Sequence, residues 1–255
     1  MKNYFRGLLA AVFAPLFAAS LFAVVSLPAL ASGDSVHLDR APVNLTDKVS
    51  LQRGAKYFVN YCLNCHSAAY MRYSRLEDLG LTEQQIKDNL MFTTDKVGDT
   101  MVSALNPKDA KEWFGGVPPD LTVASRVRGA DWLYTYLRTY YRDDKSPTGW
   151  NNKAFPNVGM PHVLHELQGV QVLKQDGDRK DHDGKPVMKL ALERPGTLKP
   201  VEYDAVVGDL VNYMVYMGEP AGKQRTQIGV FVLFFLVLFF FVAVLLKNEY
   251  WKDVK

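Results

Sequence analysis

The chain has 255 residues, of which 48% are hydrophobic and 22% are charged, and its formal net charge is +3 at pH 7. Residues 32–222 hold 23 Lys or Arg against 25 Asp or Glu, so this part is slightly acidic and offers no basic surface for nucleic acid. Two cysteines in the whole chain cannot form the disulfide framework of a small secreted scaffold.

The first 31 residues have the pattern of an export signal. Lys2 and Arg6 give a positive start, residues 7–30 carry no charge, and Ala29-Leu30-Ala31 supplies the small residues of a cleavage point. The alternative is a first transmembrane anchor, because the apolar run is long for a signal peptide. Two prolines within the run and its small-residue end favour the signal. We therefore expect residues 1–31 to be a signal peptide and the following part to be exported.

The segment after Asp47 is predicted to be a helix that ends at the first cysteine. Asp47 is a good N-cap residue, and apolar side chains then recur at helical spacing. These side chains are Leu51, Ala55, Phe58, Val59 and Cys62. Gly54 lies on the same helix and leaves room for a second helix to approach closely.

Both cysteines lie in the sequence YCLNCHS, residues 61–67. A structural zinc site needs more ligands than this chain supplies, and a thioredoxin-like pair would follow a strand in a βαβ pattern that is not visible. A disulfide between Cys62 and Cys65 remains possible, although so short a loop gains little stability from a bridge. The Cys-x-x-Cys-His spacing favours one covalently bound haem c, with both thiols on the porphyrin and His66 as an iron ligand.

Basic and aromatic residues gather in the segment 117–143. Two prolines, Pro118 and Pro119, stiffen its start, and a helix is predicted to begin near residues 129–131. Arg126 and Arg128 precede that helix and could bind the carboxylates of haem propionates, or be ordinary surface arginines. Trp132 and the neighbouring tyrosines are expected to pack, although an indole or phenol could also reach a propionate.

The sixth iron ligand is sought among the methionines and histidines. Met160 lies in FPNVGMPH, where proline and glycine prevent regular structure and favour an extended loop over the haem. His162 and His165 are rivals, since a second imidazole would also bind iron but lower its reduction potential. The pattern favours Met160. Spacing alone does not exclude Met91 and Met101.

The remaining methionines have other expected roles. Met71 would have to fold back sharply from His66, and Met188 lies in an Asp-, Lys- and Gly-rich stretch, 174–200, that is expected to be a solvated loop insertion. Met214 and Met217 belong to a helix predicted over residues 204–218, where core packing is their expected role.

Residues 228–246 are uncharged and rich in phenylalanine, which predicts a transmembrane helix. Residues 223–227 would be a short linker and residues 247–255 a cytoplasmic tail, because the export signal places the haem domain on the periplasmic side of a bacterial inner membrane. The helix before the linker resembles the C-terminal helix of c-type cytochromes, which implies that it crosses the helix ending at the haem motif, with Gly54 and Phe58 against Leu210 and Met214.

These landmarks occur in one order along almost the whole mature chain: the haem motif, the block Pro118-Pro119-Asp120-Leu121 with two arginines, the Met160 loop and a single C-terminal anchor. That order resembles the cytochrome c1 family, the haem subunits of cytochrome bc1 complexes. The resemblance implies a mainly α, cytochrome c-like haem domain with loop insertions. It also implies Met160 as sixth ligand, Arg128 on a propionate with Arg126 beside it, and Pro119 at the haem edge.

The resemblance further implies a relay of single electrons in a dimeric complex. The Rieske iron–sulfur protein, reduced by quinol at the cytochrome b subunit, would reduce the haem, and a soluble cytochrome c would then oxidise it. No substrate bond is made by this chain itself. The slight acidity of the exported part suits a basic acceptor, with Asp143, Asp144, Glu166 and the acids of 176–183 as candidate contacts.

Three other functions compete with this one. A free-standing, membrane-anchored cytochrome c could serve an oxidase, and would purify without b haem. A haem sensor or peroxidase would leave Met160 off the iron, so that carbon monoxide or cyanide binds readily. A structural protein with a simple disulfide would carry no covalent haem at all.

Overall fold

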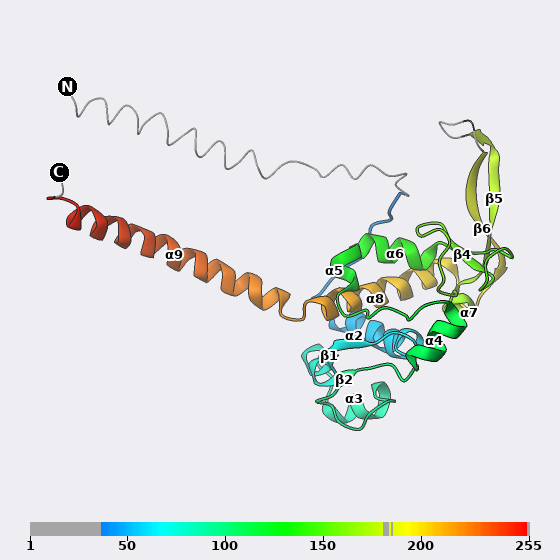
Figure 1. Ribbon diagram of the computed structural model, residues 1–255, viewed down its shortest axis with the longest axis horizontal. Coiled ribbons are helices and arrows are strands. Elements are labelled where there is room, and N and C mark those ends of the chain that lie inside the picture. Colours follow the sequence, from blue (N-terminus) through cyan, green and yellow to red (C-terminus); the bar gives the residue numbers. More distant parts are fainter. Residues whose placement is uncertain (1–36, 181–183, 185, 254–255) are drawn as a thin grey trace. The chain divides into compact units, whose positions relative to one another are not determined.

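The computed structural model describes residues 37–180, 184 and 186–253 (Figure 1). The predicted signal peptide, residues 1–31, lies outside these residues, as does His182. Helices make up about half of the described residues, which confirms the mainly α fold class.

The haem-motif helix begins as predicted. Helix α2 (Lys48–Tyr57) follows Asp47, whose carboxylate accepts a hydrogen bond from the Ser50 amide at 3.0 Å. The chain then widens into one π-helical turn, η2 (Phe58–Cys62), before it leaves the helix at Leu63. The apolar spacing of this segment does not distinguish a π turn from an α turn, so the π turn was not predicted. Single π turns occur frequently at functional sites.

Helix α8 (Pro200–Gly218) is the core helix, and most of its side chains are buried. It packs against α2 where Gly54 meets it: a Cβ on Gly54 would lie 2.1 Å from the Asp209 carbonyl oxygen and 2.6 Å from Tyr213 Cβ. The predicted crossing of these helices is confirmed, and each contact falls one residue earlier on α8 than expected. The Phe58 ring also meets Tyr213, with centroids 5.5 Å apart.

The other elements are short and join these two helices to the loops. In chain order they are β1 (Ala68–Arg72), η3 (Tyr73–Leu79), α3 (Glu83–Leu90), β2 (Thr100–Met101), α4 (Pro107–Phe114), α5 (Ala124–Arg128), α6 (Ala130–Arg138), β3 (Tyr140–Arg142), β4 (Trp150–Asn152) and α7 (His165–Gln168). Strands β1 and β2 pair antiparallel, as do β3 and β4. Helix α6 begins where the sequence predicted.

The prediction of a solvated loop insertion is correct about solvent exposure and wrong about secondary structure. Strands β5 (Gly169–Lys180) and β6 (Pro186–Pro195) form an antiparallel ribbon rather than a loop. The ribbon is largely exposed on both faces, so its side chains lack the alternation of apolar and polar residues that marks a half-buried strand. Met188 lies on β6 and is exposed.

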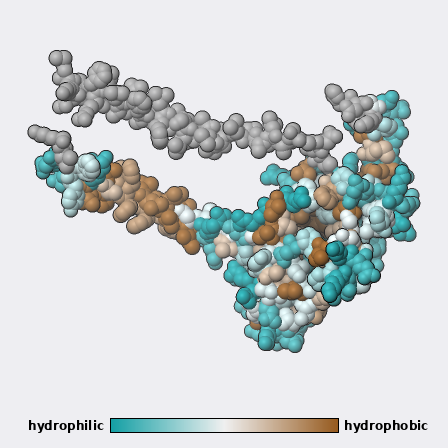
Figure 2. Space-filling model, in the orientation of Figure 1, coloured by the Kyte–Doolittle hydropathy of each residue, from teal (hydrophilic) through white to brown (hydrophobic). Residues whose placement is uncertain are grey.

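The C-terminal helix α9 (Gly222–Tyr250) contains the apolar run. Its residues Gln224–Tyr250 are long and apolar enough to cross a membrane, and Figure 2 shows the apolar band along the helix with polar residues near its ends. The helix extends beyond residues 228–246 on both sides, so the residues assigned to the linker, 223–227, are helical too. The division into linker, span and tail stays a prediction.

Substitution of Gly54 by alanine should lower the free energy of unfolding by about 1–3 kcal/mol, because the new methyl group meets backbone atoms of α8 that cannot move aside. Chemical unfolding of the detergent-solubilised protein, followed by circular dichroism, measures the change. Gly98→Ala is the matched control, since no atom lies within 4 Å of its new Cβ. Equal losses in the two variants would contradict the close packing at Gly54.

Candidate functional site

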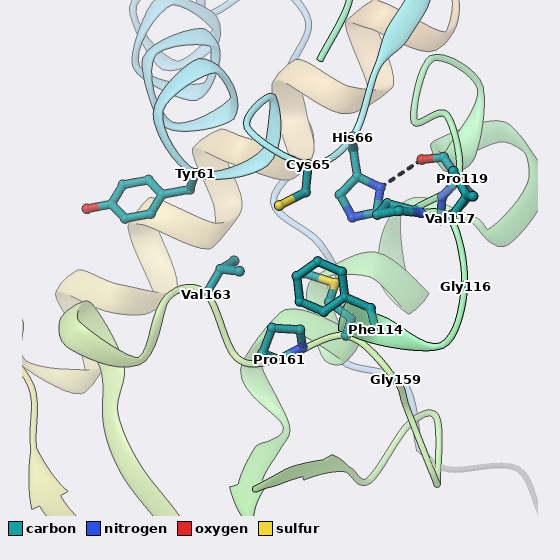
Figure 3. Close-up of a pocket in the computed structure, with 12 residues that line it drawn as sticks. Tyr61, Cys65, His66, Phe114, Gly116, Val117, Pro119, Gly159, Pro161 and Val163 are labelled. Atoms are coloured by element: carbon teal, nitrogen blue, oxygen red, sulfur yellow. Dashed lines mark hydrogen bonds between the residues drawn. The ribbon is translucent and has the colours of Figure 1, made fainter. Parts of the chain in front are cut away.

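A cleft opens where the end of η2 faces two loops. Its lining includes Tyr61, Cys65 and His66 on one side and Met160 on the other, with apolar residues of 114–119 and 159–163 completing the walls. Figure 3 shows Cys65 and His66 on one wall, with the Cys65 sulfur directed into the cleft and Phe114 and Pro161 across from it. Residues far apart in the sequence therefore meet in one apolar space.

The Cys-x-x-Cys-His segment forms a tight turn. The amides of Cys65 and His66 both donate to the Cys62 carbonyl, at 3.1 and 2.8 Å. The two cysteines are not joined in a disulfide. Burial raises the pKa of the Cys62 thiol to about 12 and also raises that of Cys65. A redox Cys-x-x-Cys pair needs a thiolate with a lowered pKa, so the local environment argues against that alternative.

His66 is held in one tautomer. Its Nδ1 lies 2.7 Å from the Pro119 carbonyl oxygen, and since a carbonyl only accepts, Nδ1 must carry the proton. The lone pair of Nε2 then faces the cleft (Figure 3). Burial lowers the pKa of His66, which keeps the ring neutral. A neutral imidazole whose other nitrogen donates to a fixed carbonyl is the usual form of a metal-binding histidine.

Asp120 fixes the Pro119 carbonyl beside His66. Its carboxylate accepts hydrogen bonds from the Ala69 amide at 2.7 Å, the Thr122 amide at 2.8 Å and the Thr122 hydroxyl at 2.6 Å. These bonds tie the segment after the prolines to the strand that follows His66. The sequence analysis gave Asp120 no role in the site. The available signal was the Asp-x-Thr spacing, since Asp commonly bonds the backbone two residues on.

The loop that carries Met160 is anchored by two asparagines of β4. Asn152 Oδ1 accepts from the amides of Ala154 and Phe155, at 2.8 and 3.1 Å. Asn151 Oδ1 accepts from the Asn157 amide at 2.8 Å. Side-chain amides thus replace the regular structure that proline and glycine prevent, and sequence reasoning missed both asparagines.

The two rival histidines lie away from the cleft. His162 is buried and stacks on Tyr140, with centroids 4.7 Å apart, and neither it nor His165 lines the cleft walls. Burial lowers the pKa of His162 to about 4, so it remains neutral near pH 7. Met160 is the methionine that the cleft contains. The remaining methionines of the described chain lie outside the cleft: Met188 is on the ribbon, and the others are buried in the core, namely Met71, Met91, Met101, Met214 and Met217.

The predicted propionate residues lie outside the cleft lining. Arg128 lies over the rings of Trp132 and Phe155, at 5.0 and 5.7 Å from their centroids, and forms no ion pair within the described part of the chain. Arg126 instead forms an ion pair with Glu219 at 2.9 Å. Trp132 is half-buried and stacks on Tyr136 at 4.8 Å. Of the two arginines, Arg128 is therefore the one whose charge has no carboxylate partner among the described residues.

The donor set fits a c-type haem. Cys65, His66 with its proton-free Nε2 and the Met160 thioether line one apolar cleft, while the Cys62 thiol is buried outside the lining, three residues before Cys65. Covalent attachment through the thiols and axial ligation by nitrogen and sulfur need these groups.

Comparison with known proteins agrees with the site. Residues 39–186 match the sequence profile of the Cytochrome C1 family. The chain is also 51% identical to the cytochrome c1 of Allochromatium vinosum over 88% of this chain and 93% of that protein. The chain belongs to the cytochrome c1 family.

Other relatives differ in name. A Nitrosomonas europaea protein named ammonia monooxygenase gamma subunit is 50% identical over 92% of this chain and 97% of its own length. The cytochrome c1 of Rhodospirillum rubrum is 25% identical over 82% of this chain. Cytochrome c1 proteins are membrane-anchored electron-transfer subunits with covalently bound haem c, so haem c is the cofactor of this chain and α9 fits a single membrane span.

Replacement of Asp120 by asparagine should weaken the support of His66, because an amide offers a donor where the carboxylate accepts from Ala69 or Thr122. We expect a loss of about 0.5–1.5 kcal/mol in the free energy of unfolding, the usual net value of a hydrogen bond, because Asp120 is exposed and water reaches the groups left unpaired. Denaturation followed at the haem absorbance measures it. Asp88→Asn is the control, since that exposed carboxylate accepts from the Gln84 side chain on the same helix. A loss no larger than the control's would remove the role given to Asp120.

Proposed function

We propose that this chain is the cytochrome c1 subunit of a quinol–cytochrome c reductase, the cytochrome bc1 complex. The observation that carries the proposal is the meeting of Cys65, His66 and Met160 in one apolar cleft. In this assignment Cys62 and Cys65 would hold the haem through thioether bonds, and His66 Nε2 and Met160 Sδ would bind its iron. When bound, the haem supplies a one-electron couple whose potential is raised by the methionine.

The protein around the cleft orients these ligands and keeps water away. The Pro119 carbonyl fixes the plane of the His66 ring, and the asparagines of β4 hold the loop that brings Met160 into the cleft. Apolar walls lower the local dielectric, which is a further control of reduction potential. Pro119 borders the cleft and would contact the haem edge.

Arg128 is proposed to bind a haem propionate. Its guanidinium lies on the Trp132 and Phe155 rings without a described carboxylate partner, so a propionate would complete its interactions. Trp132 is proposed to hold Arg128 in place, and its indole N–H could donate to the same propionate. Arg126 forms an ion pair with Glu219, so we assign it only a position next to Arg128 and no direct bond to the propionate.

Electrons are proposed to arrive from the Rieske iron–sulfur protein and leave to a soluble cytochrome c. The acidic balance of residues 32–222 favours encounter with a basic acceptor. Asp143 is a candidate contact, because it is only half-buried and a hydrogen bond from Asn151 lowers the pKa of its carboxyl. Asp144 and Glu166 are exposed.

The proposed topology places the haem domain, residues 32–222, on the periplasmic side of the inner membrane. Residues 1–31 are then a removed signal, 228–246 the span and 247–255 the cytoplasmic tail. The connection from α8 to α9 is short, because α8 ends at Gly218 and α9 begins at Gly222. So short a connection keeps the haem domain next to the membrane, within reach of cytochrome b in the dimeric complex.

Replacement of Met160 by leucine should open the sixth position of the iron. We expect a lower reduction potential, within the roughly 0.8 V range that axial ligands span, and carbon monoxide binding to the ferrous protein. Redox titration and the carbon monoxide difference spectrum measure both. Met188→Leu, on the exposed ribbon, is the matched control. Unchanged potential in Met160→Leu would show that another group binds the iron.

Gentle solubilisation and purification of the native assembly through a C-terminal tag should yield covalent c haem together with b haem and an iron–sulfur signal. Reduced-minus-oxidised spectra and electron paramagnetic resonance detect the three centres. Covalent c haem alone would indicate a free-standing carrier. Co-purification with monooxygenase subunits would favour the assembly in the name of the Nitrosomonas relative. Absence of covalent haem would overturn the proposal and leave the disulfide alternative.

A further inference from the structure

The side chain of Met160 has one hydrogen-bonding neighbour in the described structure. The hydroxyl of Tyr136, on α6, lies 3.4 Å from Met160 Sδ, with a geometry in which the phenol donates and the sulfur accepts. Thioether sulfur is a weak acceptor with two lone pairs, so it can accept this bond with one pair and keep the other. Tyr136 does not line the cleft, and none of the haem-binding roles proposed above belongs to it.

A second phenol determines the direction of the hydrogen bonds. The hydroxyls of Tyr136 and Tyr140 are 2.5 Å apart, and each has one proton to donate. If Tyr136 donated to Tyr140, the proton of Tyr140 would have no acceptor among the described hydrogen bonds, and Met160 Sδ would lose its donor. If Tyr140 donates to Tyr136 and Tyr136 donates to Met160, both protons are used. The arrangement that satisfies both phenols therefore runs from Tyr140 through Tyr136 to the sulfur.

The ring of Tyr136 is fixed on two sides. It stacks on Trp132 with the ring planes 11° apart, and it meets Tyr140 edge-on with centroids 5.3 Å apart. Tyr140 in turn stacks on His162, which lies two residues after Met160 in the same loop. Three elements, α6, β3 and the loop, thus hold the hydroxyl and the sulfur in a fixed relation.

We infer that Tyr136 is a positioning residue that donates a hydrogen bond to Met160 Sδ and so tunes the reduction potential of the haem. The inference rests on the proposed function, since it takes Met160 as the axial ligand. A donor on the sulfur withdraws electron density from the ligand. Ferric iron needs that density more than ferrous iron does, so the bond favours the ferrous state and raises the potential.

The test is the variant Tyr136→Phe in the full-length, haem-loaded protein. It keeps the ring and its packing and removes only the donor. We expect a threefold to tenfold shift of the redox equilibrium toward the ferric state, a fall of about 30–60 mV at 59 mV per tenfold for one electron. Tyr140→Phe should lower the potential less, because Tyr136 still donates but loses the bond that polarises it.

Tyr203→Phe is the matched control. Its hydroxyl donates to the Leu137 carbonyl on the same helix α6, at 2.8 Å, so its loss removes a buried phenol bond without touching the sulfur. It should lower stability and leave the potential unchanged. Equal falls in Tyr203→Phe and Tyr136→Phe would mean a general loosening of the domain and would overturn the inference.

The absorption band of methionine-ligated ferric haem separates the two proposals. If the wild type shows the band and Tyr136→Phe has the wild-type potential, the inference fails and the ligand assignment stands. If Tyr136→Phe does not fold, the same comparison is made with Tyr140→Phe, and an unchanged potential there overturns the inference. If the wild type lacks the band, Met160 is not the ligand and both proposals fail.

Discussion

The close crossing of α2 and α8 is the constraint on which the site depends. The backbone of α8 passes so near Gly54 that a Cβ would lie 2.1 Å from the Asp209 carbonyl. Arg53 reinforces the crossing with two hydrogen bonds to the Asp209 carboxylate, at 2.5 and 2.9 Å. Because α2 runs directly into the π turn that ends at Cys62, the position of the crossing also sets where both thiols and His66 lie. A shift of α2 along α8 would carry the haem motif with it.

Polar side chains hold the loops on both sides of the cleft, with Asn151 and Asn152 buried and Asp120 exposed. The two faces of the cleft come from irregular segments, and an irregular backbone needs hydrogen-bond partners when it is packed against a protein core. Asp120 supplies them beside His66, and Asn151 and Asn152 supply them beneath the Met160 loop. Each group is an acceptor for two or more backbone amides, so a single side chain fixes a whole turn. Tyr136 and Tyr140 likewise use side-chain hydrogen bonds, here to hold the sulfur of Met160.

The connection to the membrane is charged as well as short. Glu219 lies between α8 and α9 and pairs with Arg126, 2.9 Å away, and with Arg225, 2.5 Å away. One carboxylate therefore links the helix start of α9 to the segment that precedes α6. Exposed pairs of this kind contribute little stability each. Here they help to position the start of α9. Arg126 is itself held in place, because the hydroxyl of the preceding residue, Ser125, donates to the Met214 carbonyl inside the core.

The sequence by itself determined the haem motif, the helix before Cys62 and the apolar C-terminal helix, since each is a local pattern of residue type and spacing, and it favoured Met160, whose role as ligand stays a proposal. The crossing of the two helices was predicted from the resemblance to c-type cytochromes. Only the tertiary structure decided which side chains hold the ligands: Asp120, the β4 asparagines and Tyr136 act across gaps in the sequence that no local pattern spans. The π turn and the β5–β6 ribbon were not predicted from the sequence for a related reason. A π turn keeps nearly helical spacing, and a ribbon exposed on both faces has no buried side to set a period of two.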